Sequence, residues 1–128
     1  MIQIKRIYDP AGHNDGYRVL IDRLWPRGIK KDQANIDLWL KEVAPTPELR
    51  KWFHEDPIER WREFDSKYRA ALVKNEAVTA LTELVEKHQK VTLVYGAKDQ
   101  EHNHALILRL YLEEKMHFHP TKKAAPFK

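Results

Sequence analysis

The segment Val91–Ala105 constrains the fold of this chain most strongly, because an apolar run passes through a polar loop directly into a helix. Val91–Tyr95 predicts a strand, and the helix is expected from residue 103 to residue 114. The charged loop and the free N–H groups at the helix start then lie at one carboxyl edge of a sheet. Since α/β proteins usually bind ligands at such an edge, we expect a binding site there.

Length and composition restrict the class of protein. The 128 residues fit one domain, which can bury a core without a metal or a disulfide. The absence of cysteine fits a reducing compartment and excludes thiolate nucleophiles and iron–sulfur clusters. No apolar run approaches the roughly 20 residues that span a bilayer, and no signal-peptide pattern is present. We therefore expect a cytoplasmic protein with no membrane partner.

The net charge of +4 comes mostly from the carboxyl-terminal residues. Residues 116–128 contain Lys122, Lys123 and Lys128 and no acidic residue. Residues 1–115 are nearly neutral and mix both signs along their helices, which argues against nucleic-acid binding by this part. We expect a single α/β domain over residues 1–115 and a basic, flexible tail over residues 116–128.

Two strands are expected in the amino-terminal part. Ile2–Tyr8 alternates between two faces, as an edge strand does, and residues 9–16 are rich in turn formers. Tyr17–Leu24 contains a nearly continuous apolar run, which predicts a central strand covered on both faces. The link between these strands is too short for a helical crossover, so the residues alone favour an antiparallel pair over a parallel one.

Apolar spacing and start signals predict the helices. A first helix is expected from one stripe, formed by Ile36, Trp39, Leu40 and Val43. Thr46-Pro47 and Asp56-Pro57 are start signals for the second and third helices. The third places Ile58, Trp61, Phe64, Tyr68 and Leu72 on one face. A fourth runs from about residue 76 to residue 88.

Polar residues gather where the central strand is expected to end. The guanidinium groups of Arg23 and Arg27 could bind a phosphate or carboxylate, and Trp25 could stack on a base or sugar. Asp22 is a candidate for proton transfer. A structural Asp22–Arg23 network that ties the strand end to neighbouring loops explains the same residues equally well.

A second polar group surrounds the start of the last helix. Lys98 and Asn103 are candidates for ligand binding. Asp99 could transfer protons, although capping of the helix N–H groups is the commoner role for such an aspartate. His104 lies in the first turn, where an imidazole tends to stay neutral and suits acid–base catalysis.

Neither a metal nor a cofactor is indicated. His102 and His104 lack the i,i+4 relation of a helical metal site, and no glycine-rich nucleotide fingerprint is present. The only serine, Ser66, lies inside an expected helix, which argues against a serine triad.

Three sets of motifs carry a resemblance: RVLIDRLWPRGI, the block from APTPELRKWF to KYRAAL, and VTLVYGAKD followed by EHNHALIL. Together they resemble the YeaO-like family of uncharacterised bacterial proteins, domain of unknown function 488, up to about residue 115. The resemblance implies a small, mainly parallel sheet of three or more strands with helices packed against it. It also implies parallel first strands, and we prefer that topology to the antiparallel pair.

Related domains in this wider group have Cys-His-Arg at the start of a helix, where this chain has Asn103-His104-Ala105. His104 is kept, while the thiol and the arginine are not. If the relatives are thiol-dependent enzymes, this chain has lost that chemistry or works differently.

Two classes of function fit the sequence. One is binding of a small phosphate- or nucleotide-type anion at the strand ends, in a hydrolase or a transferase. Arg23, Trp25, Arg27, Lys98 and Asn103 would bind the ligand, and Asp22, Asp99 and His104 would handle protons. The other is a non-catalytic module that binds nucleic acid or protein through the basic tail. A homodimer formed through the aromatic helix face is compatible with both.

Overall fold

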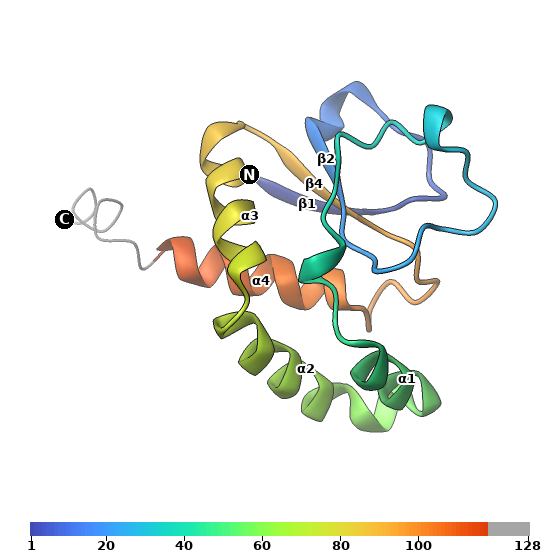
Figure 1. Ribbon diagram of the computed structural model, residues 1–128, viewed down its shortest axis with the longest axis vertical. Helices are drawn as coiled ribbons and strands as arrows, with labels where there is room; N and C mark the ends of the chain where they lie inside the picture. Colours follow the sequence, from blue (N-terminus) through green and yellow to red (C-terminus); the bar gives the residue numbers. More distant parts are fainter. Residues whose placement is uncertain (118–128) are drawn as a thin grey trace.

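One sheet of four parallel strands forms the centre of the protein in a computed structural model, which describes residues 1–117 (Figure 1). The strands are β1 (Ile2–Arg6), β2 (Tyr17–Leu20), β3 (Leu38–Trp39) and β4 (Val91–Tyr95). Their order across the sheet is β1-β4-β2-β3, and every neighbouring pair is parallel. The expected small parallel α/β sheet is confirmed, with β1 at an edge and β2 in the interior.

Four helices cover one face of this sheet (Figure 1). They are α1 (Pro47–Glu55), α2 (Pro57–Val73), α3 (Glu76–Lys87) and α4 (His104–His117). Their apolar residues join those of the strands in the main core. The other face carries a smaller apolar cluster, which loop residues cover instead of a helix: Trp25, Ile29 and Ile36 pack there against Leu20 and Val94. None of the described helices is long and apolar enough to cross a membrane.

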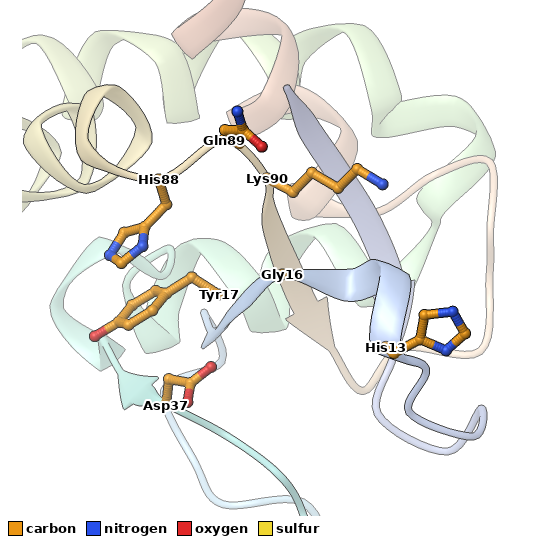
Figure 2. A pocket seen from close by; sticks show the side chains of 7 residues that line it. All are labelled: His13, Gly16, Tyr17, Asp37, His88, Gln89 and Lys90. Atoms are coloured by element: carbon orange, nitrogen blue, oxygen red, sulfur yellow. The ribbon is translucent and has the colours of Figure 1, made fainter.

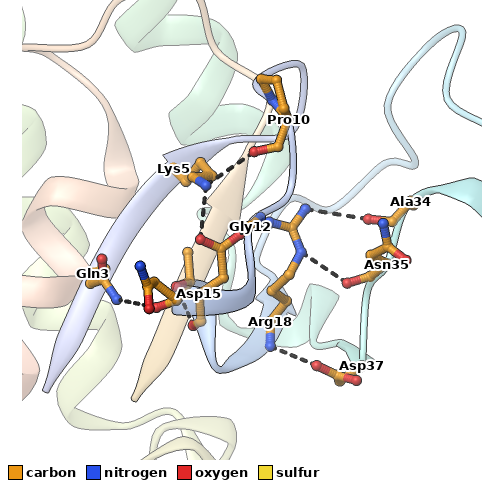
Figure 3. Close-up of polar contacts among 11 residues, drawn as sticks. Gln3, Lys5, Pro10, Gly12, Asp15, Arg18, Ala34, Asn35 and Asp37 are labelled. Carbon is orange, nitrogen blue, oxygen red and sulfur yellow. Dashed lines mark hydrogen bonds and ion pairs between the residues drawn. The ribbon is translucent and has the colours of Figure 1, made fainter.

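The antiparallel pairing of the first two strands, favoured by the short link, is wrong. Strand β4 lies between β1 and β2 and pairs in parallel with both. The link therefore runs back from the carboxyl end of β4 to its amino end, and a buried carboxylate holds it in place (Figure 3). Asp15 accepts hydrogen bonds from Lys5, from the N–H of Gly12 and from Arg18, while Thr92 of β4 donates to the Asp15 carbonyl.

Burial alone would raise the pKa of Asp15, but the hydrogen bonds from Lys5, Gly12 and Arg18 outweigh it and hold this pKa below its usual value. Arg18 also donates to the carbonyls of Asn35 and Ala34, so one ion network joins the first link to the loop after β2 (Figure 3). These contacts, rather than a crossover helix, fix the parallel arrangement.

The expected first helix is also wrong. Of its apolar stripe, only Trp39 lies in β3 and only Val43 in a 3-10 turn at Lys41–Val43, while Ile36 and Leu40 lie in neither element. The N–H of Asp37 donates to the Arg18 carbonyl and that of Leu40 donates to the Leu20 carbonyl, so the segment pairs with the open edge of β2. Asn35, with φ of 55°, turns the chain before this strand. Pairing with β2, which is distant in the sequence, gives backbone groups of this segment the hydrogen bonds that a helix would have formed locally.

The start signals of the next two helices are confirmed. Thr46 accepts a hydrogen bond from the N–H of Leu49, and Asp56 accepts one from the N–H of Glu59. On α2, Phe64, Tyr68 and Leu72 are buried as expected, but Ile58 is 72% exposed. Helix α4 reaches His117, beyond the helix end expected at residue 114; residues 118–128 of the expected tail lie outside the described residues, so the tail stays a prediction.

Candidate functional site

The carboxyl ends of β2 and β4 lie next to each other, so the residues that follow them meet at one edge of the sheet. The N–H of Ile21 donates to the Val94 carbonyl at 3.0 Å. One carboxylate oxygen of Asp22, Oδ2, accepts a hydrogen bond from the N–H of Gly96 at 2.9 Å. Asp22 is thereby held across the gap between the two strands.

His104 begins α4 directly beside this carboxylate. Its Nε2 lies 3.0 Å from the Ile21 carbonyl oxygen and 3.4 Å from Asp22 Oδ1. Because the carbonyl can only accept, we assign the imidazole proton to Nε2. The structure thus brings together Asp22 and His104, two of the three residues that the sequence marked for proton transfer.

The surroundings of this pair keep His104 neutral. Burial lowers the pKa of His104, while the charge of Asp22 and the hydrogen bond to the Ile21 carbonyl act in the opposite direction. The charge of Arg50 adds to the lowering. The imidazole and the buried ring of Tyr68 pack edge to face, with the ring centroids 6.1 Å apart. A neutral, well-packed imidazole is the result.

The pair itself is only partly covered, with the side chains of His104 and Asp22 14% and 22% exposed. Asp22 Oδ1 is buried and accepts no hydrogen bond from the described residues, because the His104 N–H that lies 3.4 Å away is directed at the Ile21 carbonyl. The backbone carbonyl of Asp22 accepts a hydrogen bond from the indole N–H of Trp39. A ligand therefore cannot reach Oδ1 without a movement of the neighbouring side chains, while the Asp22 side chain as a whole is 22% exposed.

Arg23 and Tyr68 bind three successive carbonyl groups of the segment before α1. Tyr68 donates its hydroxyl proton to the Val43 carbonyl at 2.7 Å. The guanidinium of Arg23 donates to the carbonyls of Ala44 and Pro45, at 3.1 and 3.3 Å. Much of the hydrogen-bonding capacity of Arg23 is thus used within the protein. These contacts, which we call the Val43–Pro45 clamp, fix the start of α1 against the end of β2.

Sequence reasoning missed two residues of α1, Arg50 and His54, that lie near enough to His104 for charges to act between them. Both are exposed. Partial burial lowers the pKa of His54, and the charges of Arg50 and His104 lower it further. The i,i+4 spacing places both residues on one side of α1, but nothing in the sequence says that this side turns toward the end of β2.

The loop before α4 uses its polar residues for its own structure. Asn103 is buried and accepts the N–H of Leu106, so it caps α4, and its amide donates to the Asp99 carbonyl. The expectation that Asp99 caps this helix is wrong: its carboxylate accepts the N–H groups of Glu101 and His102 within the loop. Burial would raise the pKa of Asp99, but these hydrogen bonds lower it.

The remaining candidates lie apart from the Asp22–His104 pair. Trp25 packs edge-on against Trp39 and donates its N–H to the Ile29 carbonyl. Arg27 and Lys98 are exposed, and no described hydrogen bond or ion pair joins either side chain to Asp22, Arg23 or His104. Their binding roles stay predictions. Within residues 1–117, no three histidine or acidic side chains are grouped to hold a metal ion.

Comparison with known proteins identifies relatives over most of the chain. A family model described as the inactive DUF488-N3 subclade matches residues 1–126. The uncharacterized protein YeaO of Escherichia coli (strain K12) is 47% identical over 111 residues, which cover 87% of this chain and 96% of YeaO. An uncharacterized protein of Mycobacterium tuberculosis is 39% identical over 107 residues, covering 84% of this chain and 89% of that protein. No solved structure matches. The YeaO-like resemblance is confirmed.

Proposed function

The chain belongs to the inactive DUF488-N3 subclade, and on that premise we propose that it binds a small anion at the carboxyl end of β2 without converting it. The family is uncharacterised, so its membership names no ligand. The proposal rests on one observation: basic groups surround a single carboxylate whose oxygens are turned inward, to Gly96 and His104.

The balance of charge at this edge supports an anionic ligand. Arg23, Arg50 and two imidazoles share one neighbourhood, in which the charge of Arg50 acts on both His54 and His104. Asp22 is the acid among them, and its oxygens point inward, to Gly96 and His104. Exposed Arg50 and His54 are therefore available to an anion, and an anion would relieve the repulsion between them.

The bonding of His104 supports binding without turnover. Its Nε2 proton is directed at the Ile21 carbonyl, which cannot take up a proton at neutral pH. The oxygen of Asp22 that lies beside this proton, Oδ1, is buried. The chain also contains no cysteine at the helix start, where related domains have one. These features fit the word inactive in the family's description.

Thermal and denaturant unfolding with inorganic phosphate tests the binding. Phosphate at about ten times its Kd should raise the free energy of unfolding by about 1.4 kcal/mol. The double variant Arg50→Ala, His54→Ala should lose this effect. Lys51→Ala is the matched control, because Lys51 is an exposed basic residue of the same helix that does not act on His54 or His104. It should respond to phosphate as the wild type does.

Two results would count against the proposal. If phosphate did not raise the free energy of unfolding of the wild type, the exposed face of α1 would not be an anion site. The same would follow if the Lys51 variant lost as much of the phosphate effect as the double variant. If the wild type instead hydrolysed or transferred a phosphoryl group and His104→Ala stopped this, the protein would be a hydrolase or transferase, and the proposal of binding without turnover would be wrong.

A further inference from the structure

A hollow of about 380 Å³ lies at the opposite edge of the sheet, where β2 and β4 begin (Figure 2). Its walls come from the start of β2, from the residue before β3, and from the segment that joins α3 to β4. The volume falls within the range of sites that hold small molecules, roughly 300–1,000 Å³. No residue of the carboxyl-edge site contributes to it.

Gly16 brings the walls close together. Its φ of 68° is a conformation that side chains other than glycine rarely adopt, and a Cβ atom there would lie 2.4 Å from the Lys90 carbonyl oxygen. The next residue, Tyr17, donates its N–H to the same carbonyl at 2.9 Å. The backbone of Gly16, which carries no side chain, therefore lies at the base of the hollow between two groups of side chains (Figure 2).

On one side of Gly16 lie two stacked rings and a carboxylate (Figure 2). The rings of Tyr17 and His88 are 4.2 Å apart and tilted by only 16°. Asp37 lies beside Tyr17, and its Oδ2 accepts the N–H of Arg18 at 2.8 Å. The anchored Asp37 leaves its second oxygen, Oδ1, to accept a hydrogen bond from a ligand.

On the other side of Gly16 lie two basic side chains, Lys90 and His13 (Figure 2). Neither makes a side-chain hydrogen bond or an ion pair with the described residues, unlike Lys5 and Arg18, which are both paired with Asp15. The hollow thus offers an aromatic wall with a hydrogen-bond acceptor at one end, and an ammonium and an imidazole at the other.

We propose that this hollow binds a mononucleotide, its base against the Tyr17–His88 stack and its phosphate toward Lys90 and His13. A base with an amino group can donate to Asp37, and the phosphate matches the unpaired ammonium of Lys90. Aromatic side chains commonly stack on nucleobases. This proposal is independent of the anion site at the carboxyl edge.

Chemical-shift titrations of the ¹⁵N-labelled protein with AMP, adenosine and inorganic phosphate test it. AMP should bind at least about tenfold more tightly than either part alone. Its shifts should centre on residues 16–17, 37 and 88–90. Lys90→Ala should weaken AMP binding about tenfold and leave adenosine binding unchanged, whereas Tyr17→Leu should weaken both.

Two matched variants keep the result specific. Lys87→Ala removes an exposed lysine of α3 that does not line the hollow, so AMP binding should be unchanged. Arg50→Ala should also leave it unchanged, which separates this site from the carboxyl-edge site. The proposal is overturned if 10 mM AMP shifts none of these resonances, if phosphate binds as tightly as AMP, or if Lys87→Ala weakens AMP as much as Lys90→Ala.

Discussion

The Val43–Pro45 clamp makes a quantitative prediction about the variant Tyr68→Phe. This change removes one hydroxyl group and keeps the ring, so the contacts of the ring with Phe64 and His104 remain. The hydroxyl donates to the Val43 carbonyl at 2.7 Å, and both residues are buried, with exposed fractions of 1% and 0%. The variant loses this hydrogen bond and leaves a carbonyl without a partner or access to water.

The expected cost is about 1–3 kcal/mol of the free energy of unfolding. With a urea dependence of roughly 1.5 kcal/mol per molar, a loss of about 2 kcal/mol lowers the unfolding midpoint by about 1.3 M. Tryptophan fluorescence can follow the transition, since the chain contains four tryptophans. The dependence of the free energy of unfolding on urea concentration should not change, because unfolding of the variant exposes the same surface.

Tyr8→Phe is the matched control. The Tyr8 hydroxyl also donates to a carbonyl, that of Arg27, at 2.9 Å, but Tyr8 is 45% exposed and water can replace the bond. Its cost should stay below about 0.5 kcal/mol. If Tyr68→Phe cost no more than Tyr8→Phe, the buried hydroxyl would not hold the segment before α1, and this account of the clamp would be refuted.

Two further predictions concern charged groups. Because burial lowers the pKa of His104 below the ordinary 6.5, the unfolded chain binds its proton at a higher pH than the folded chain does. The free energy of unfolding, measured with urea, should therefore decrease as the pH falls below about 6.5. His104→Asn should make this decrease smaller. If the variant showed the same dependence on pH as the wild type, the result would argue against a buried neutral imidazole. Asp15→Ala should cost about 3–5 kcal/mol in the same assay, because it leaves the buried guanidinium of Arg18 without its carboxylate. Asp65→Ala, which breaks the partly exposed pair with Arg69, should cost less than about 1 kcal/mol, and equal costs would contradict the assignment of Asp15 as a structural centre.

Local signals in the sequence located the helix starts correctly. Thr46-Pro47 and Asp56-Pro57 each place a capping oxygen before a residue with a fixed φ, and both start helices as expected. The periodicity of residues 36–43 was misleading, because a stripe of four apolar residues can also divide between a strand and a turn. Pairing with β2 decided this segment, and the sequence of the segment does not contain that information.

The residues of the candidate site also separate into those that the sequence could predict and those that depend on the tertiary structure. Its residues Asp22 and His104 were recognisable because a strand end and a helix start are marked locally and both belong to one edge of an α/β sheet. Arg50 and His54 were not recognisable, since their place depends on the direction of α1 after the Val43–Pro45 clamp. Trp25, Arg27 and Lys98 were grouped with the site because they are near it in sequence, and the structure shows no contact that joins them to Asp22.

The amino-acid sequence by itself determined the strand Val91–Tyr95, the caps of α1 and α2, and the class of fold, because each depends on neighbours within a few residues. It also located the start of the second strand at Tyr17, although this strand ends at Leu20 and not at the expected Leu24. Only the tertiary structure decided that β4 lies between β1 and β2, that residues 38–39 form a strand, and which side chains are open to a ligand. These features depend on contacts between residues far apart in the chain, such as Thr92 with Asp15 and Tyr68 with Val43. Such contacts form only when the whole chain has folded, so no local pattern records them.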